Sequence, residues 1–257
     1  MAQYSFDRRR VNGPEESTYP VFDEDAILEK PTTGQRKNRS PTDIRPIFLQ
    51  PGLISQATGS AYIETEKTKL ACAIYGPRQS KNTGFNEKGR LNVEVKFAPY
   101  SCQKRRAPMH DAEDRSVAMA IHQALISSVR LETFPKATID IFITVIETDG
   151  MEGCVAAGSI AASIALAHAG IELLGLVVSC SAAVVGSEIW LDPTNEESLQ
   201  ASGTLVFSCM PALNVVTNVW QNGRIEPERV LSCMEACQSR CDNIHTVAAQ
   251  ALLEGAT

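Results

Sequence analysis

The most conspicuous absence in this sequence is positive charge: no lysine or arginine occurs between Ala137 and Gly223. The whole chain has a formal net charge of −6 and a pI near 5.3. This balance argues against generic electrostatic binding of nucleic acid by the whole surface, although a local basic patch could still bind it.

Several patterns typical of enzymes and metal proteins are also missing. The sequence contains no P-loop, G-x-S-x-G, H-E-x-x-H or G-x-G-x-x-G motif, and no C-x-x-C pair among its eight cysteines. Most cysteines lie in apolar segments, so we interpret them as reduced core residues of an intracellular protein. Cys237, Cys241 and His245 have a spacing that could bind a metal, but core packing is the better interpretation. We predict no metal and no cofactor.

The length and composition favour one globular domain, or two small halves fused without a linker. With 257 residues, 44% hydrophobic and 21% charged, the chain can bury a large core. No apolar run follows Arg8-Arg9-Arg10, so no secretory signal is predicted. The Ala-rich, uncharged run 153–169 is slightly short for a bilayer span, and Glu172 separates it from the next apolar run, so we expect no membrane-spanning helix. Residues 1–43 are polar and proline-containing, which predicts an extended or disordered arm, with an alternative in which it orders on a partner.

Hydrophobic periodicity predicts an α/β fold with mixed sheets. Strands are predicted at residues 44–49, 59–64, 68–75, 91–97, 137–147, 173–185, 187–191, 203–209 and 213–220. The first three should form an antiparallel meander, and Asn222-Gly223 should form a turn. Helices are predicted over 153–169, from an N-cap at Asp111 or Asp114 to before Phe134-Pro135, and from Pro227 onward. The helix at 153–169 has no charge on any side and should be buried all round.

Basic residues collect instead in two loops of the first half. They are Arg78, Lys81, Lys88 and Arg90 in one loop, and Lys104, Arg105 and Arg106 in the next. Two such loops at the ends of neighbouring strands could form one positive rim that contacts RNA phosphates without reading bases. Alternatively, both are ordinary solvated turns, in which lysines and arginines commonly collect.

Nine short motifs resemble, in order, the landmarks of RNase PH-type proteins. They are Asp43-Ile44-Arg45-Pro46, Gly59-Ser60-Ala61-Tyr62, Thr68-Lys69, Tyr75-Gly76-Pro77-Arg78, Ala98-Pro99-Tyr100, Phe134-Pro135-Lys136, Ile139-Asp140-Ile141-Phe142, Ala169-Gly170-Ile171 and Leu191-Asp192-Pro193. The resemblance implies the RNase PH-type fold (ribosomal protein S5 domain 2-like), as a single domain over 44–257 with an N-terminal extension.

Two further segments, 8–17 and 105–108, are more similar to the animal exosome branch of this family than to bacterial RNase PH. That resemblance implies subunits that pair and assemble into a six-membered ring around a channel for single-stranded RNA. It also implies docking of an S1-domain cap protein, no membrane association, and residence in the nucleus, nucleolus and cytoplasm.

Active members of the family hold inorganic phosphate with an arginine at the start of the first helix and with a Gly-Ser/Thr-Arg turn. Arg115 is placed like the first of these groups. The segment that corresponds to the turn, 150–155, contains no arginine, and Glu152 adds negative charge there. A bound phosphate would therefore lose a bidentate partner.

Active members also carry two aspartates six residues apart around the Leu-Asp-Pro strand. Asp192 fits the second, but the first corresponds to Gly186, which offers no acid, base or ligand. The resemblance therefore implies a non-catalytic ring subunit that supports 3′-to-5′ RNA processing and decay, with Arg115 and Asp192 as vestiges. One alternative is an active phosphate-dependent exoribonuclease that recruits Asp149, Glu152, Glu188 or Asp192 as ligands. The other is an unrelated soluble α/β domain.

Overall fold

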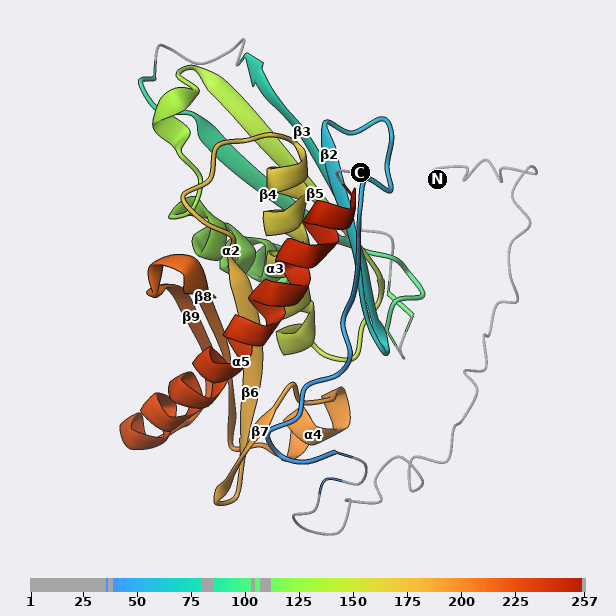
Figure 1. The fold of residues 1–257 in the computed structure, drawn as a ribbon. Coiled ribbons are helices and arrows are strands. Elements are labelled where there is room, and N and C mark those ends of the chain that lie inside the picture. The colour runs from blue at the N-terminus through green and yellow to red at the C-terminus, as the bar shows by residue number, and fades with distance from the viewer. Residues whose placement is uncertain (1–35, 37–38, 80–85, 103–104, 107–111, 256–257) are drawn as a thin grey trace, which may run out of the picture. The chain divides into compact units, whose positions relative to one another are not determined.

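The computed structural model describes residues 36, 39–79, 86–102, 105–106 and 112–255 (Figure 1). Lys81, Lys104 and most of the arm predicted at 1–43 lie outside the described residues. Asn38–Thr257 forms one compact unit.

The larger of two sheets has five strands in the order β1-β2-β3-β5-β4. The strands are β1 Phe48–Pro51, β2 Gly59–Thr65, β3 Thr68–Gln79, β4 Arg90–Phe97 and β5 Ala137–Glu147. The first three form the predicted antiparallel meander, whereas β4 runs parallel to β5. The bounds of β5 match its prediction, because its alternating isoleucines and Val145 face the core.

The smaller sheet is antiparallel, with the order β7-β6-β8-β9. Its strands are β6 Val178–Val185, β7 Glu188–Leu191, β8 Gly203–Met210 and β9 Val215–Gly223. The strand predicted from residue 173 begins only at Val178, because Leu174 bonds to Ser128 and Leu173 bridges Val129 outside this sheet. The turn predicted at Asn222-Gly223 is wrong, since both residues continue the pairing of β9 with β8.

The helices are α2 Ala112–Ile126, α3 Met151–His168, α4 Asn195–Gln200 and α5 Pro227–Gly255, with 3₁₀ turns at Leu131–Thr133 and Pro211–Leu213. Helix α2 ends earlier than predicted, and Asp114 lies inside it as a buried residue rather than at its N-cap. Helix α4 was not predicted. Its Thr194 and Glu197 form a capping box, a Thr-x-x-Glu signal that is visible in the sequence.

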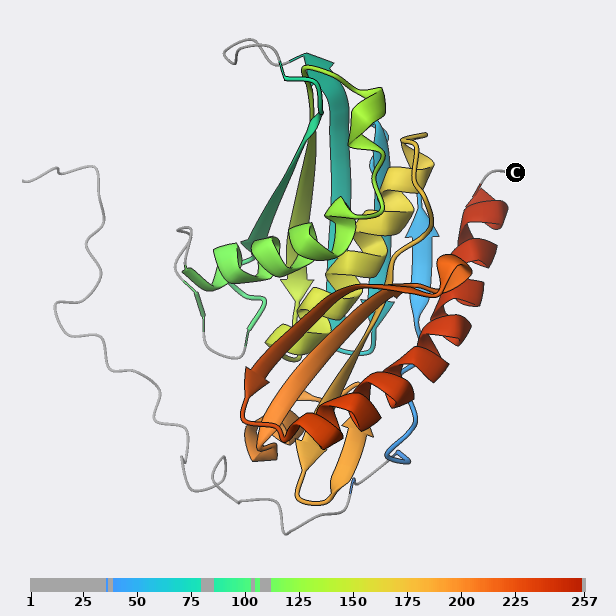
Figure 2. The same cartoon turned by 90° about the vertical axis from the view of Figure 1, so that its left-hand side faces the viewer.

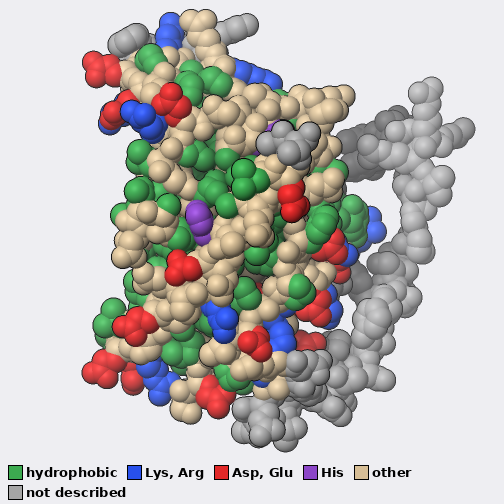
Figure 3. Space-filling view, viewed as in Figure 1, with side chains coloured by type: hydrophobic (Ala, Val, Ile, Leu, Met, Phe, Trp, Pro, Cys, Tyr) green, Lys and Arg blue, Asp and Glu red, His purple; other side chains and the backbone are tan. Residues whose placement is uncertain are grey.

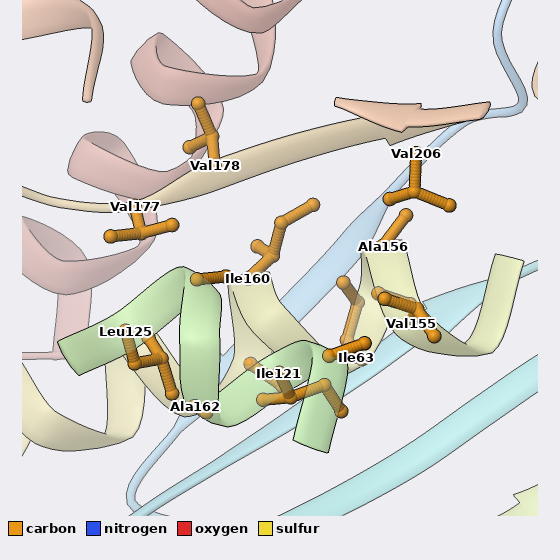
Figure 4. Close-up of a cluster of buried hydrophobic side chains, with 14 of the residues drawn as sticks. Ile63, Ile121, Leu125, Val155, Ala156, Ile160, Ala162, Val177, Val178 and Val206 are labelled. Carbon is orange, nitrogen blue, oxygen red and sulfur yellow. The ribbon is translucent and has the colours of Figure 1, made fainter. Parts of the chain in front are cut away.

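Helices α2 and α3 lie between the two sheets, and α5 covers the opposite face of the small sheet (Figure 2). Figure 4 shows the packing at α3: Val155, Ala156 and Ile160 face Ile121 of α2, Ile63 of β2 and Val206 of β8. In the described part of the chain, α3 alone has the length and apolar composition of a membrane span, but 83% of it is buried in the protein. It is therefore a core helix, surrounded as its uncharged sequence predicts.

Replacing Ala162 with Phe should overpack this layer and prevent folding, because Ala162 is fully buried in α3. Overpacking commonly costs about 1–3 kcal/mol and occasionally more. Urea unfolding and solubility of Ala162→Phe would be compared with those of His168→Phe, at the exposed end of the same helix. A soluble Ala162→Phe protein with an unchanged unfolding midpoint would contradict this packing.

Candidate functional site

Most positions that the family resemblance assigns to phosphate or carboxylate chemistry lie at one end of the large sheet. Because β4 and β5 are parallel, their carboxyl ends at Phe97 and Glu147 lie together, and β3 starts beside Glu147. Hydrogen bonds hold the loops there: the backbone N–H of Asp149 donates to the hydroxyl of Thr68 (3.4 Å), and that of Thr148 donates to the carbonyl of Ser101 (3.0 Å). Helix α3 starts immediately after these loops.

A buried arginine occupies the centre of this end. The residue Arg45 is 2% exposed. Its Nε donates to Oδ2 of Asp192 at 2.7 Å, its Nη2 to Oδ1 at 2.5 Å, and its backbone N–H to Oδ2 at 2.9 Å. Its Nη1 donates to Oδ2 of Asp149 at 3.0 Å. One guanidinium thus satisfies both oxygens of Asp192 in a bidentate pair and also binds a second carboxylate.

A second arginine extends this cluster. Arg39 lies 3.3 Å from Oδ2 of Asp192 and 3.8 Å from Glu197 on α4. Between the two arginines, the backbone N–H of Leu191 donates to the carbonyl of Pro41 at 2.8 Å. Residues 39–45 therefore run beside the end of β7. The cluster contains two cations and three carboxylates, and the sequence analysis assigned a role to Asp192 and Asp149 but not to Arg39, Arg45 or Glu197.

The pKa values of Asp192 and Asp149 shift in opposite directions. Burial alone would raise the pKa of Asp192, but hydrogen bonds and charge from Arg45 outweigh it and lower that pKa. At Asp149 burial is the larger effect and raises the pKa, with Arg45 opposing it. Asp192 is therefore ionised at neutral pH and cannot donate a proton there. It also has a left-handed backbone (φ 50°), a conformation that its bonds to Arg45 help to hold.

The first turn of α3 contains a carboxylate where the family resemblance would place phosphate. Glu152 is 7% exposed, and its Oε1 accepts a 2.8 Å hydrogen bond from the hydroxyl of Thr204. A helix N-terminus favours an anion because its free N–H groups carry partial positive charge. Here the chain supplies that anion itself, so an incoming phosphate would meet a fixed negative charge.

Two predicted basic residues lie exposed at the same end of the large sheet. Arg105 belongs to the loop after Phe97, and Arg115 is in the first turn of α2, which that loop leads into. Arg106 differs, because its guanidinium lies 4.4 Å from the ring centre of Phe97 and pairs with Glu113 and Asp114. Its charge is neutralised within the chain.

The remaining basic residues lie at the opposite end. Arg78 on β3 and Arg90 on β4 both pair in register with Thr138, at the start of β5. Lys88 forms an exposed ion pair with Glu132. The length of β4, roughly 25 Å, separates this end from Arg105. The prediction of a single basic rim is therefore wrong, because one loop precedes β4 and the other follows it, so the two lie at opposite ends of that strand.

The predicted pairing of position 186 with Asp192 is also inconsistent with the structure. Gly186 lies at the exposed tip of the hairpin between β6 and β7, with φ 59°, and its carbonyl accepts a bond from Arg229. Asp192 follows the far end of β7, roughly 13 Å along the strand. A carboxylate at the tip could not share a metal or a proton with Asp192. Among the described residues, no three His, Cys, Asp or Glu side chains are arranged to hold a metal ion.

The arrangement of two sheets around α2 and α3 is that of an RNase PH-type protein. Rice (Oryza sativa) Rrp46 has this fold, with a TM-score of 0.74 and 23% identity over 84% of this chain and 98% of that one. A chain of the Archaeoglobus fulgidus exosome with RNA bound to the active site also has it, with a TM-score of 0.71 and 17% identity over 80% and 89% of the two chains. These similarities establish the fold.

The chain belongs to the 3′ exoribonuclease family: residues 43–172 match its domain 1 and residues 175–240 match its domain 2. It is 36% identical to the exosome complex component mtr3 of Schizosaccharomyces pombe, over 96% of both chains. It is also 36% identical to MTR3 of Homo sapiens, over 97% of this chain and 96% of that one. The predicted resemblance to RNase PH-like exosome components is confirmed.

Replacing Arg45 with Met should destabilise the fold strongly, because it leaves Asp192 buried without its bidentate partner. Breaking a buried ion pair on one side typically costs about 3–5 kcal/mol. The matched control is Arg240→Met, whose partner Asp43 is 4.0 Å away and 56% exposed. An exposed pair of that kind contributes about 0–1 kcal/mol. Equal urea midpoints for the two variants would show that the Arg45 pair does not stabilise the fold.

Proposed function

We propose that this chain is a non-catalytic subunit of the RNA exosome ring that supports 3′-to-5′ RNA processing and decay, including rRNA processing, mRNA turnover and RNA surveillance. The proposal rests on one observation: the charged side chains of the candidate site bind other groups of the same chain. Arg45 is engaged with Asp192 and Asp149, and Glu152 occupies the N-terminus of α3. Similarity along nearly the whole chain to proteins named as exosome complex components supports the assignment.

The chemistry of phosphate binding supports the non-catalytic reading. Attack by inorganic phosphate needs cations that hold a group carrying close to two negative charges. Of the cations near the start of α3, Arg45 and Arg39 already bind carboxylates, and Lys67 acts electrostatically on Asp149. Arg115 is exposed and lies at the same end of the sheet. It is the one predicted phosphate ligand that the alternative, an active phosphate-dependent exoribonuclease, retains.

Three of the described sheet edges are protected against pairing with a strand of another chain. Strand β4 carries exposed charges at Arg90, Glu94 and Lys96, which discourage pairing with another chain. Strands β1 and β7 have four residues each; Gly255 at the end of α5 lies against Pro51 of β1, and Pro41 binds the backbone of β7. These three edges are charged, short or covered.

Strand β9 is the exception among the described edges. It has nine residues and no charge, and Val215, Val216 and Val219 are exposed. Beside it, the exposed Met119 of α2 adds apolar surface, and Asn218 bonds to the Ala120 carbonyl across this junction. A long, uncharged edge strand offers free backbone donors and acceptors to a partner strand. We assign β9 to the contact with a neighbouring subunit of the ring.

The double substitution Val216→Lys/Val219→Lys should prevent incorporation into a reconstituted exosome ring, because lysines on an edge strand oppose pairing with another strand. Incorporation would be measured by size-exclusion chromatography, with circular dichroism to verify folding. Leu253→Lys is the control, an exposed leucine at the far end of α5. Normal incorporation of the folded double variant would rule out β9 as the contact.

The two separated groups of arginines allow a test of the RNA path. We place the RNA contact at the end that holds Arg105 and Arg115, because both side chains are exposed beside the loops of the candidate site. Charges of both signs are interspersed on the face that carries α5, which offers no single basic field (Figure 3). Arg78 and Arg90 lie at the opposite end of the large sheet and serve as matched controls.

In an assembled ring, Arg105→Glu/Arg115→Glu should weaken binding of single-stranded RNA, and Arg78→Glu/Arg90→Glu should not. Each lost phosphate contact should lower the slope of log K against log salt by about 0.7. Affinity would be measured by fluorescence anisotropy at several salt concentrations. The idea fails if the first pair leaves affinity unchanged, or if the second pair has the larger effect. Arg106 is left intact, because its reversal would place a third carboxylate beside Glu113 and Asp114.

The remaining parts of the proposal rest on resemblance to exosome components. We propose that the assembled ring receives an S1-domain cap protein and that the chain resides in the nucleus, nucleolus and cytoplasm. Co-purification of a cap protein with the tagged chain from each compartment tests both statements.

A further inference from the structure

Cysteines gather where α5 crosses the small sheet. Five of the eight lie there: Cys180 on β6, Cys209 on β8, and Cys233, Cys237 and Cys241 on α5. All five are free thiols with 5% exposure or less. Small buried side chains let a helix approach a sheet closely, and Cα atoms of α5 and β8 come within 8 Å of each other.

The strand register brings two of these cysteines to the same face. Cys209 pairs with Val178, which is two residues from Cys180 on β6. Because side chains alternate along a strand, all three point to one side of the sheet. Figure 4 shows Val178 directed away from the α3 cluster and toward the side that α5 covers. Cys237 and Cys241 lie one turn apart on that helix.

The thiols form two facing pairs. Cys237 interacts electrostatically with Cys180, and Cys241 with Cys209, across the contact between the helix and the sheet. Nothing in the described residues is arranged as a metal site. Two neighbouring thiols without a metal have one characteristic chemistry, which is two-electron oxidation to a disulfide.

The pair formed by Cys209 and Cys241 is the more reactive one. Cys209 lines a small cavity of about 20 Å³, together with Met210, Gln238 and Asp242. The interaction with the Cys241 thiol lowers the pKa of Cys209, and the same contact together with burial raises the pKa of Cys241. The reactive form of cysteine is the thiolate. Cys209 is therefore the nucleophile, and Cys241 remains protonated beside it.

We infer that Cys209 and Cys241 are a peroxide-sensitive dithiol whose oxidation links β8 to α5. The Cys209 thiolate sulfur attacks one oxygen of hydrogen peroxide, the O–O bond breaks, and a sulfenic acid and hydroxide form. The Cys241 sulfur then attacks the Cys209 sulfur, and the S–O bond breaks as water leaves with the Cys241 proton. The hydroxide takes up the proton that Cys209 released when it became a thiolate, so two thiols are oxidised and one peroxide is reduced to two waters.

The test uses the purified full-length chain, treated with hydrogen peroxide while folded and then alkylated. Peptide mapping without reductant should find Cys209 joined to Cys241, and a dithiol reductant should release the two peptides. The link should be absent from Cys241→Ser and present in Cys237→Ser, its neighbour one turn away. Oxidised wild-type protein should also unfold at a higher urea midpoint, because the crosslink restricts the unfolded chain.

Three results would overturn the inference: no linked peptide after peroxide treatment, a link between Cys180 and Cys237 as the sole product, or Cys209 oxidised further without a link. If Cys241→Ser does not fold, the wild-type map alone decides, and Cys209→Ser provides the second variant. None of these outcomes depends on the proposed role in the exosome.

Discussion

The guanidinium of Arg45 is the interaction on which the rest of this structure depends. It joins three segments that are far apart in the chain: the approach to β1, the loop after β5 through Asp149, and the end of β7 through Asp192. Because Arg45 is 2% exposed, water cannot replace a lost partner there. The geometry that keeps the two sheets in place around α3 therefore requires each charge of the cluster to remain paired.

The same charged groups determine what the candidate site can bind. In this family the end of the sheet beside α3 is where phosphate and a reactive carboxylate are expected, and here the same groups hold the fold together. Asp192 accepts bonds on both oxygens, and Glu152 is fixed by Thr204 at the helix N-terminus. Assembly, in contrast, needs exposed and unsatisfied surface, which β9 offers with its nine uncharged residues. We therefore propose that this chain keeps the fold and an assembly surface of its family without the catalytic chemistry.

Local patterns in the sequence predicted the local structure well. Strand β5 and helix α3 lie where alternation and uncharged composition place them, and the capping box at Thr194 and Glu197 could have revealed α4. The failures at the candidate site are questions of long-range geometry. Arg45 and Asp192 are 147 positions apart, so no spacing shows that they meet. The two basic loops were predicted to lie together, but one precedes β4 and the other follows it, so they lie at opposite ends of that strand. The six residues between Gly186 and Asp192 span a hairpin strand, so these two positions do not share a site.

The most direct test of the account is turnover of a 3′-tailed RNA by the reconstituted ring, with inorganic phosphate and, separately, with magnesium. The ring would contain either the wild-type chain or Arg115→Ala, each confirmed to assemble; Arg115 is exposed and lies outside the buried charge cluster. The account predicts equal nucleotide release from both rings, and no assembly when this chain is omitted. Phosphate-dependent release of nucleoside diphosphates that disappears with Arg115→Ala would contradict it and establish the chain as an active exoribonuclease.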